Sequence, residues 1–440
     1  MNKILLLGAG LVSRPMVTYL SDVPEFQLTI ATRTVSKAEA MAQGRANVHC
    51  LALDVSDENA LSEQVAAHDV VISLLPWTLH LKVAKLCLEH GKHMVTTSYI
   101  SDAMRELDAP VRAKKLLFLN EIGVDPGIDH MSAMQIIHEV QAKGGKVTAF
   151  YSFCGGLPAP DANDNPFGYK FSWSPRGVVL AGRNTATWLE TGEVVSTPGP
   201  ELFAAPKLWP VDGLGEFEVY PNRNSVPYRE VYGLQGIKTL MRGTFRNIGW
   251  CPTLKRIADL GLLDDTERPE LNEMSYAQMT ARLVNGNAAT VREDTARFLS
   301  LAPDDAIIER LAWLGLFDEL ELKLRTPSYL DALSDIMQQK MTLQAGERDL
   351  VLMQHRFDVE YEDGSKERIF ATMDEYGIPD GDTAMARTVS LPAAIATRLL
   401  LQGKLDQTGV VIPNMPAIYE PVMAELGEMG IALRETRQPL

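Results

Sequence analysis

Strand-like and helix-like stretches alternate along the first 120 residues of the chain. Short apolar runs predict strands, and stretches with helical periodicity separate them. The predicted strands span residues 3–7, 27–31, 48–53, 70–74, 93–96 and 116–119. The first predicted helix follows residue 10 and ends near residue 20, and the others span 36–42, 58–67, 79–90 and 102–113. This alternation is typical of a parallel sheet with crossover helices. It predicts a six-stranded Rossmann-like unit.

The pattern becomes irregular past Gly127. Residues 155–177 are crowded with Pro, Gly, Asn and Asp, and an irregular segment of this length is usually functional or disordered. Four aromatic residues interrupt it, namely Phe167, Tyr169, Phe171 and Trp173. Because aromatic side chains seek burial or a ligand, they argue against disorder.

The second half of the chain predicts a helical part followed by a return to a sheet. Leu, Ala, Glu and Arg recur at helical spacing from about Pro252 to Gln344. Two strand-like stretches follow at 350–361 and 365–372, and Asp363-Gly364 between them favours a hairpin. Further helices are predicted at 391–401 and 418–429.

These elements predict an α/β protein with three parts. The expected parts are a Rossmann domain at 1–125, with the helices from about residue 390 as candidates to pack on it, an α/β domain formed by 126–251 and 345–390, and a helical subdomain at 252–344.

Charge and cysteine content restrict the classes of partner. The formal net charge of −15 disfavours binding to nucleic acid, because a polyanion needs clustered Lys and Arg. The four cysteines, at positions 50, 87, 154 and 251, show neither CxxC spacing nor a His-rich companion cluster, so no metal site is expected. Reduced thiols fit a cytoplasmic protein best.

The N-terminus shares one feature with signal peptides, since Lys3 precedes an apolar run. Gly8 and Gly10 break that run, and Arg14 and Pro15 follow it. No uninterrupted apolar stretch approaches the roughly 20 residues that span a bilayer. We therefore expect a soluble protein that is not exported and has no membrane partner.

A glycine-rich turn lies between the first predicted strand and the first predicted helix. Its sequence is Gly8-Ala9-Gly10-Leu11-Val12-Ser13. In a dinucleotide-binding fingerprint the first glycine allows the tight turn and the second lets the pyrophosphate approach the backbone at the helix N-terminus. Ser13 replaces the third glycine, which loosens the usual close packing of helix on strand. The strand–turn–helix context predicts a dinucleotide site.

The end of the second predicted strand bears on the type of cofactor. Enzymes that use NAD commonly place Asp or Glu there, whereas this chain has Thr32-Arg33-Thr34. A guanidinium and two hydroxyls suit a 2′-phosphate, so NADP(H) is favoured over NAD(H). A solvated surface Arg remains the alternative. Asp54 after the third strand fits an adenine contact, and Leu75 after the fourth fits the nicotinamide path, although both are also ordinary loop residues.

The complete predicted cofactor-binding set follows the ends of five strands. It contains Gly8, Gly10, Leu11, Val12, Thr32, Arg33, Thr34, Asp54, Val55, Leu75, Thr97 and Ser98.

Four longer blocks go beyond a general dinucleotide-binding pattern. They are HMVTTSY at 93–99, NEIGVDPGIDH at 120–130, CGGLPAPDANDNPFGYKFSW at 154–173, and PNR at 221–223 with RGTFR at 242–246. With these blocks the chain resembles the glutamate-forming saccharopine dehydrogenases, also called saccharopine reductases. The resemblance covers most of residues 1–250 and is weaker beyond about Pro252.

This resemblance implies a fold and an activity. The implied fold has a Rossmann domain, an α/β substrate and dimerisation domain and a helical insertion, and the implied assembly is a homodimer. The implied reaction interconverts saccharopine, a small amino-acid substrate, with glutamate and 2-aminoadipate 6-semialdehyde, using NADP(H).

A substrate with three carboxylates and a secondary amine needs guanidinium forks and hydroxyl donors. Arg223 and Arg246 are the candidate forks, although a structural ion pair would also explain either one. The resemblance places Ser98, Tyr99, Asp125, Arg223, Thr244, Phe245 and Arg246 at substrate positions.

Three residues in the matching blocks are candidates for handling protons. Asp125 suits the substrate amine but is also a turn-forming residue before Pro126. Tyr99 suits a donor to a carboxylate or carbinolamine oxygen but is also explained as a half-buried aromatic residue at a strand end. Cys154 is equally explained as a buried structural thiol. His80 and His130 are left out, because a lone His is more often a core or loop residue.

Two other functions remain open. A dehydrogenase for a polyamine-type amino acid such as carboxynorspermidine would need fewer guanidinium forks. A non-catalytic NADP-binding sensor on the same fold is the other alternative, because a fold alone does not define a function.

Overall fold

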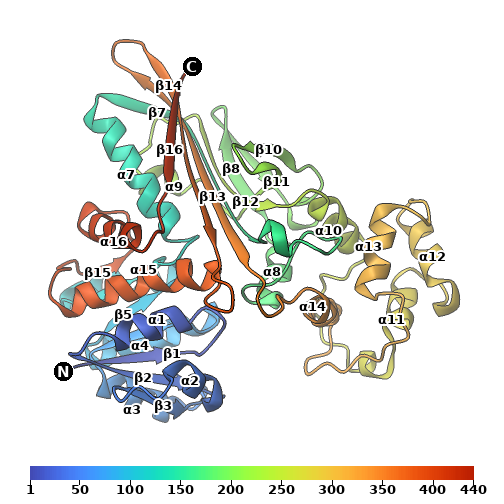
Figure 1. Cartoon of the computed structure of the whole chain (residues 1–440), viewed down its shortest axis with the longest axis horizontal. Coiled ribbons are helices and arrows are strands. Elements are labelled where there is room, and N and C mark those ends of the chain that lie inside the picture. Colours follow the sequence, from blue (N-terminus) through green and yellow to red (C-terminus); the bar gives the residue numbers. More distant parts are fainter. The chain divides into compact units, whose positions relative to one another are not determined.

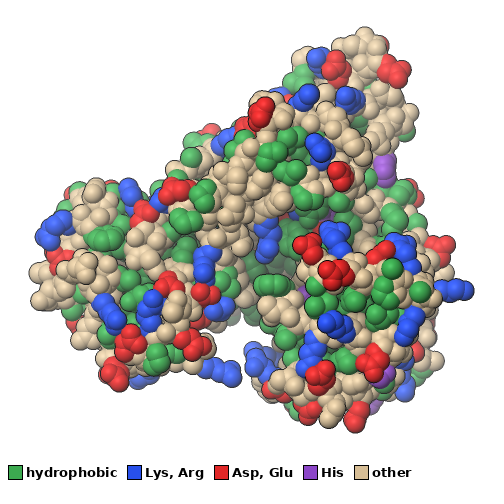
Figure 2. All heavy atoms as spheres, turned by 180° about the vertical axis from the view of Figure 1, so that it is seen from behind, with side chains coloured by type: hydrophobic (Ala, Val, Ile, Leu, Met, Phe, Trp, Pro, Cys, Tyr) green, Lys and Arg blue, Asp and Glu red, His purple; other side chains and the backbone are tan.

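A computed structural model describes the chain from Met1 to Leu440. The residues form two compact units. The first contains 1–147, 359–367 and 371–439, and the second contains 148–358, 368–370 and Leu440. Acidic and basic side chains are interspersed over the face shown in Figure 2.

The first unit is built on a parallel sheet of seven strands (Figure 1). The strands are β1 (Asn2–Leu7), β2 (Phe26–Thr32), β3 (Val48–Ala52), β4 (Val70–Ser73), β5 (His93–Thr96), β6 (Leu117–Leu119) and β15 (Gly409–Val411). Their order is β15-β6-β5-β4-β1-β2-β3. The six predicted strands are confirmed. The seventh, β15, pairs with β6 and was missed, because three residues are too few for a recognisable apolar run.

Helices surround this sheet. They are α1 (Arg14–Ser21), α2 (Val35–Ala42), α3 (Glu58–Ala67), α4 (His80–His90), α5 (Asp102–Arg105), α6 (Asp108–Ala113), α7 (Ile128–Ala142), α15 (Ala384–Leu401) and α16 (Pro416–Glu428). The single helix predicted at 102–113 is wrong, because α5 ends at Arg105 and α6 restarts at Asp108. Pro110 explains the restart, since proline is tolerated in the first turn of a helix but not in its interior.

Helix α15 is long and apolar enough to cross a membrane by composition alone. In the structure 72% of it is buried, and it packs against α1 and α16. This burial is what the core helix of a folded domain shows.

A second sheet has nine strands, of which β7, β13 and β14 contribute residues to both units. Its main order is β10-β11-β12-β7-β13-β14-β16, and β8 pairs with β12 and β9. The strands are β7 (Gly145–Pro158), β8 (Ala186–Glu190), β9 (Glu193–Thr197), β10 (Lys207–Val211), β11 (Gly215–Pro221), β12 (Thr239–Arg246), β13 (Asp349–Tyr361), β14 (Lys366–Tyr376) and β16 (Arg434–Pro439). The predicted hairpin is confirmed, with Tyr361 N–H donating to the Ser365 carbonyl at 2.9 Å.

Strand β7 corrects the boundary of the irregular segment, which was expected to begin at Gly155. The strand runs on to Pro158 and includes Cys154 in its interior. A Cβ at Gly155 would lie 2.5 Å from the Phe245 carbonyl oxygen, so this glycine permits close approach of two backbones. Sequence alone does not distinguish that role from a turn.

The second unit also contains a helical part with a core of its own. Its helices are α10 (Trp250–Asp259), α11 (Tyr276–Leu283), α12 (Val291–Phe298), α13 (Ala306–Leu314) and α14 (Tyr329–Lys340), and short helices α8 (Pro175–Ala181) and α9 (Tyr228–Val231) precede them. Short 3₁₀ turns lie at Trp77–Leu79, Pro160–Ala162, Gly199–Glu201, Pro269–Glu273 and Ala288–Thr290. Phe167, Tyr169 and Phe171 are buried in this core, as their aromatic character predicted.

Candidate functional site: a dinucleotide edge and a buried arginine

The carboxyl ends of the parallel strands define one edge of the first sheet (Figure 1). Strand order runs outward in opposite directions from the β1–β4 pair. In open α/β sheets a ligand binds outside the carboxyl ends at such a point of reversal. All predicted cofactor-binding residues lie at or after these strand ends, so the fold gathers them on one edge.

The turn after β1 has the geometry of a phosphate-binding loop. Gly8 has a φ of +109°, and a Cβ there would lie 3.2 Å from the Leu74 carbonyl oxygen. A Cβ at Gly10 would meet nothing within 4 Å, so the space before this residue is open. Ser13, which stands where a third glycine was expected, is buried and accepts a hydrogen bond from Gly10 N–H at 3.1 Å. Its hydroxyl therefore braces the turn.

Two N–H groups of this loop are available to a ligand. Those of Leu11 and Val12 have no hydrogen-bond acceptor within the chain, and helix α1 begins without a side-chain cap. N–H groups at a helix N-terminus bind phosphate oxygens well. The loop therefore fits a dinucleotide pyrophosphate.

The ends of β2 and β3 carry the residues predicted to select the cofactor. Arg33 and Thr34 are exposed, and Arg33 has no carboxylate within ion-pair distance. Hydrogen bonds from the Ser56 side chain and backbone lower the pKa of Asp54, and the positive charge of Arg33 adds to that effect. The Val55 carbonyl accepts a hydrogen bond from Lys82 Nζ at 2.9 Å. Because Arg33 is exposed and has no ion-pair partner, its guanidinium is accessible to a 2′-phosphate.

The ends of β4 and β5 are bridged by a buried histidine. Leu75 is half-buried, and Thr97 packs against Gly123. Ser98 contacts His80 Nε2 through its hydroxyl at 2.8 Å. His80 was left out of the predicted site, and the structure shows it in contact with a residue inside it.

Two predicted proton-handling residues lie together. The Tyr99 hydroxyl donates to Asp125 Oδ1 at 2.7 Å, although the two residues are 26 positions apart. Both side chains are half-buried. Asp125 belongs to the loop between β6 and α7, in which Gly127 has a φ of +147° and a Cβ there would lie 2.1 Å from the Gly123 carbonyl oxygen. The pair combines a hydroxyl donor with a carboxylate.

A buried histidine–glutamate contact supports the loops that carry Tyr99 and Asp125. His130 Nε2 lies 2.7 Å from Glu121 Oε2, and both side chains are almost fully buried. Glu121 accepts a hydrogen bond from Ile100 N–H at 2.9 Å, and its own N–H donates to the Ser98 carbonyl. Sequence reasoning missed this pair, although the block NEIGVDPGIDH contains both residues.

A separate group of predicted residues lies in the second unit around Arg246. In the register of β7 and β12, Thr244 stands beside Cys154. Arg246 is 6% exposed, and its guanidinium carbon lies 5.1 Å from the centre of the Tyr169 ring and 5.5 Å from that of Trp250. Its Nε and the indole N–H of Trp250 are buried without a hydrogen-bond partner. Unsatisfied buried donors of this kind suit a carboxylate ligand.

The remaining predicted substrate residues have different surroundings. Phe245 is fully buried between Phe153 and Phe217, so its side chain contributes to the core. Arg223 is exposed, follows β11 and has a φ of +54°. Tyr220, which was not predicted, lies 5.9 Å from the Arg246 guanidinium, and burial raises its pKa to about 12.

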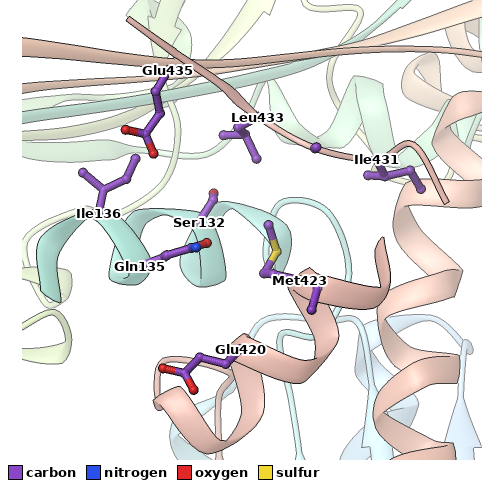
Figure 3. Close-up of a pocket in the computed structure, with 10 residues that line it drawn as sticks. Ser132, Gln135, Ile136, Glu420, Met423, Ile431, Leu433 and Glu435 are labelled. Carbon is purple, nitrogen blue, oxygen red and sulfur yellow. The ribbon is translucent and has the colours of Figure 1, made fainter. Parts of the chain in front are cut away.

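A cavity of about 330 Å³ lies elsewhere in the first unit (Figure 3). Residues of α7 and α16 and the segment 431–435 line it, and Ser132, Gln135 and Met423 are among them. It contains none of the predicted site residues.

The parallel sheet, its glycine-rich turn and the strand-end residues define a dinucleotide-binding protein of the α/β class. The profile of the saccharopine dehydrogenase NADP binding domain matches residues 4–119, and that of the saccharopine dehydrogenase C-terminal domain matches residues 123–431. The chain therefore belongs to the saccharopine dehydrogenase family. The resemblance seen in the sequence blocks is confirmed, and it extends beyond Pro252.

Individual relatives agree with this assignment. A saccharopine dehydrogenase [NADP(+), L-glutamate-forming] from Pyricularia oryzae is 41% identical, covering 99% of this chain and 98% of that protein. The protein of that name from Saccharomyces cerevisiae is 38% identical with 99% of each chain covered. The solved apo structure of histidine-tagged saccharopine dehydrogenase (L-Glu forming) from Saccharomyces cerevisiae matches with a TM-score of 0.89, 36% identity and 100% of both chains covered.

Proposed function

We propose that this chain is an NADP(H)-dependent oxidoreductase that interconverts saccharopine with L-glutamate and 2-aminoadipate 6-semialdehyde. The observation that carries the proposal is the similarity, at 38–41% identity over 99% of the chain, to fungal proteins named for that activity. The site chemistry agrees with it.

The carboxyl edge of the first sheet supplies the proposed cofactor contacts. Arg33, with Thr32 and Thr34 beside it, binds the 2′-phosphate, and the N–H groups of Leu11 and Val12 bind the pyrophosphate. The adenine lies at Asp54 and Val55, and the nicotinamide lies at Leu75, Thr97 and Ser98. When bound at these residues, the nicotinamide would supply hydride transfer to or from the carbon that carries the substrate nitrogen.

Guanidinium groups are the proposed anchors for the substrate carboxylates. Arg246 is held in a buried aromatic setting where its charge attracts a carboxylate more strongly than in water. The Trp250 N–H provides a second donor at that position. Arg223 is the proposed second fork, and Thr244 and Ser98 add hydroxyl donors. Two guanidinium forks, Arg223 and Arg246, favour a substrate with several carboxylates over a polyamine-type one.

The Tyr99–Asp125 pair is proposed to handle the substrate amine. In the direction of saccharopine synthesis an amine adds to an aldehyde, the adduct loses water to form an imine, and reduction follows. The first two steps move protons. The Asp125 carboxylate accepts a hydrogen bond from Tyr99 and suits the ammonium of the substrate. Cys154 stays a candidate for proton transfer or a structural thiol, and substrate positioning supplies much of the rate.

Turnover by the purified protein tests the proposal. With saccharopine and NADP, reduced nicotinamide is expected to accumulate at a rate that depends on both compounds. Turnover of carboxynorspermidine without turnover of saccharopine would favour the polyamine-type reading. Tight NADPH binding without turnover of any imino-linked amino acid would favour the sensor.

A cytoplasmic location and a homodimeric state are parts of the same proposal. All four cysteines are free, which agrees with a reducing compartment. Light scattering of the purified protein tests the dimer, with a mass of twice 48.6 kDa expected.

A further inference from the structure

His80 joins three strand-end hydroxyls beneath the proposed nicotinamide path. It is the first residue of α4 and is 5% exposed. Its Nδ1 lies 2.9 Å from Ser73 Oγ at the end of β4, and its Nε2 lies 2.8 Å from Ser98 Oγ beyond β5. Thr96 Oγ1 makes a longer contact with Nε2, at 3.3 Å. One imidazole therefore links a core hydroxyl to a hydroxyl of the proposed site.

The hydrogen-bonding capacity of His80 and Ser73 determines which group donates and which accepts in their contact. Burial lowers the pKa of His80 to about 4, so near neutral pH the ring is uncharged and carries one N–H. Ser73 is fully buried, and Nδ1 is the sole hydrogen-bond partner of its side chain. If Nδ1 carried the hydrogen, the Ser73 hydroxyl hydrogen would be buried without an acceptor, which costs free energy. Ser73 therefore donates to Nδ1.

This assignment places the hydrogen of the ring on Nε2. The Nε2–H then donates along the shorter contact to Ser98 Oγ, and only the Thr96 hydroxyl hydrogen is left without an acceptor on the ring. With Nδ1 protonated and both short contacts kept, the hydroxyl hydrogens of Ser73 and Thr96 would both lack an acceptor. Ser98 is half-buried, whereas Ser73 and Thr96 are buried. The hydroxyl hydrogen of Ser98 is consequently directed to the exposed side of the contact.

We propose that His80 is a positioning residue that fixes Ser98 as a hydrogen-bond donor to an oxygen of the bound ligand. The inference rests on the proposed function for its ligand, which is either a substrate carboxylate or the amide oxygen of the nicotinamide. His80 itself touches neither. It acts by holding Ser98 Oγ in place and by occupying one of its acceptor sites.

Two amide variants separate the two ring nitrogens. In His80→Gln the amide nitrogen occupies the place of Nε2 and retains the donor to Ser98. In His80→Asn the amide reaches only the place of Nδ1 and loses that donor. We expect His80→Asn to lose on the order of 10-fold in kcat/KM for saccharopine, the effect of one hydrogen bond, and His80→Gln to stay within about 3-fold of the parent. Equal activity of the two variants would overturn the proposal.

The Ser98→Ala background tests whether His80 acts through Ser98. There, His80→Asn is expected to cause no further loss, because the hydroxyl that it positions is gone. Losses that multiply would mean that His80 acts by another route and would overturn the proposal. A raised KM for saccharopine in His80→Asn assigns the ligand oxygen to the substrate. A raised Kd for NADPH assigns it to the cofactor.

A spectroscopic readout keeps the inference independent of turnover. Nitrogen-15 NMR of histidine-labelled protein, with His80 assigned from the His80→Asn spectrum, is expected to show a neutral ring protonated at Nε2. Protonation at Nδ1 would overturn the inference even if the enzyme is active. Absence of saccharopine turnover in the parent protein would contradict the proposed function, and the NMR result would still decide the hydrogen-bond direction.

Discussion

Arg33→Ala should change the preference for NADPH over NADH without destabilising the fold. Arg33 is exposed at the end of β2, and no carboxylate lies within ion-pair distance of it. Its influence on Asp54 ranks below the two hydrogen bonds from Ser56, which the Arg33→Ala variant retains. We therefore expect the free energy of unfolding to change by no more than about 0.5 kcal/mol, as for an ordinary surface substitution.

The expected effect on NADPH is much larger. A hydrogen bond to a charged group contributes about 1.5–3 kcal/mol, so losing the contact with the 2′-phosphate should reduce kcat/KM for NADPH roughly 10- to 150-fold. NADH has a ribose hydroxyl at that position, and its kcat/KM should change by less than about 3-fold. The ratio of the two efficiencies therefore falls by about one to two orders of magnitude.

Steady-state kinetics with each cofactor at saturating amino-acid substrate measures this ratio. Arg297→Ala is a matched control, because it removes the same charge from a side chain of α12 that is 77% exposed and far from the dinucleotide edge in sequence. The control should leave both efficiencies unchanged. Equal losses with NADPH and NADH in Arg33→Ala would refute the assignment of Arg33 to the phosphate.

Three further predictions concern the substrate anchor, the buried histidine–glutamate contact and acid stability. Arg246→Lys should raise the KM for saccharopine at least about 10-fold, because an ammonium lacks the paired donors of a guanidinium, and an unchanged KM would count against the anchor. His130→Ala should lower the free energy of unfolding in urea by about 3 kcal/mol, since it removes the imidazole from the buried Glu121 carboxylate, and a loss below about 1 kcal/mol would argue that the contact is unimportant. Burial lowers the pKa of His80 from 6.5 to about 4, so the unfolded chain binds more protons between these values and stability falls as the pH drops through that window. Urea titrations at several pH values should show a loss from His80 of up to about 3 kcal/mol, and the loss in His80→Phe should be smaller by about that amount.

Most of the first sheet was predictable from sequence, because continuous apolar runs mark β1, β4 and β6. Strand ends then indicated the proposed cofactor-binding residues, and the fold gathers these residues because parallel strands share one carboxyl edge. Strand β15 was not predictable, because its three residues carry too little pattern. The role of Gly155 was hidden for another reason, namely that its contact is with Phe245, 90 positions later.

The chemical site was predicted as a set of residues but not as an arrangement. Tyr99 and Asp125 were separate candidates, and their hydrogen bond depends on the loop after β6. The aromatic side chains around Arg246 are Tyr169, Tyr220 and Trp250. The sequence indicated that Tyr169 seeks burial or a ligand, but not that these three rings surround one guanidinium. The two histidines left aside, His80 and His130, are buried with polar partners, and that partnership is visible only in the folded chain.

Identification of the products of saccharopine oxidation tests the central claim most directly. Purified protein is incubated with saccharopine and NADP, and the amino acids formed are identified by mass spectrometry. Oxidation at the carbon derived from the aminoadipate side chain releases glutamate and 2-aminoadipate 6-semialdehyde, and this is the predicted result. Release of lysine and 2-oxoglutarate would mean that hydride leaves from the glutarate side, and it would contradict the account.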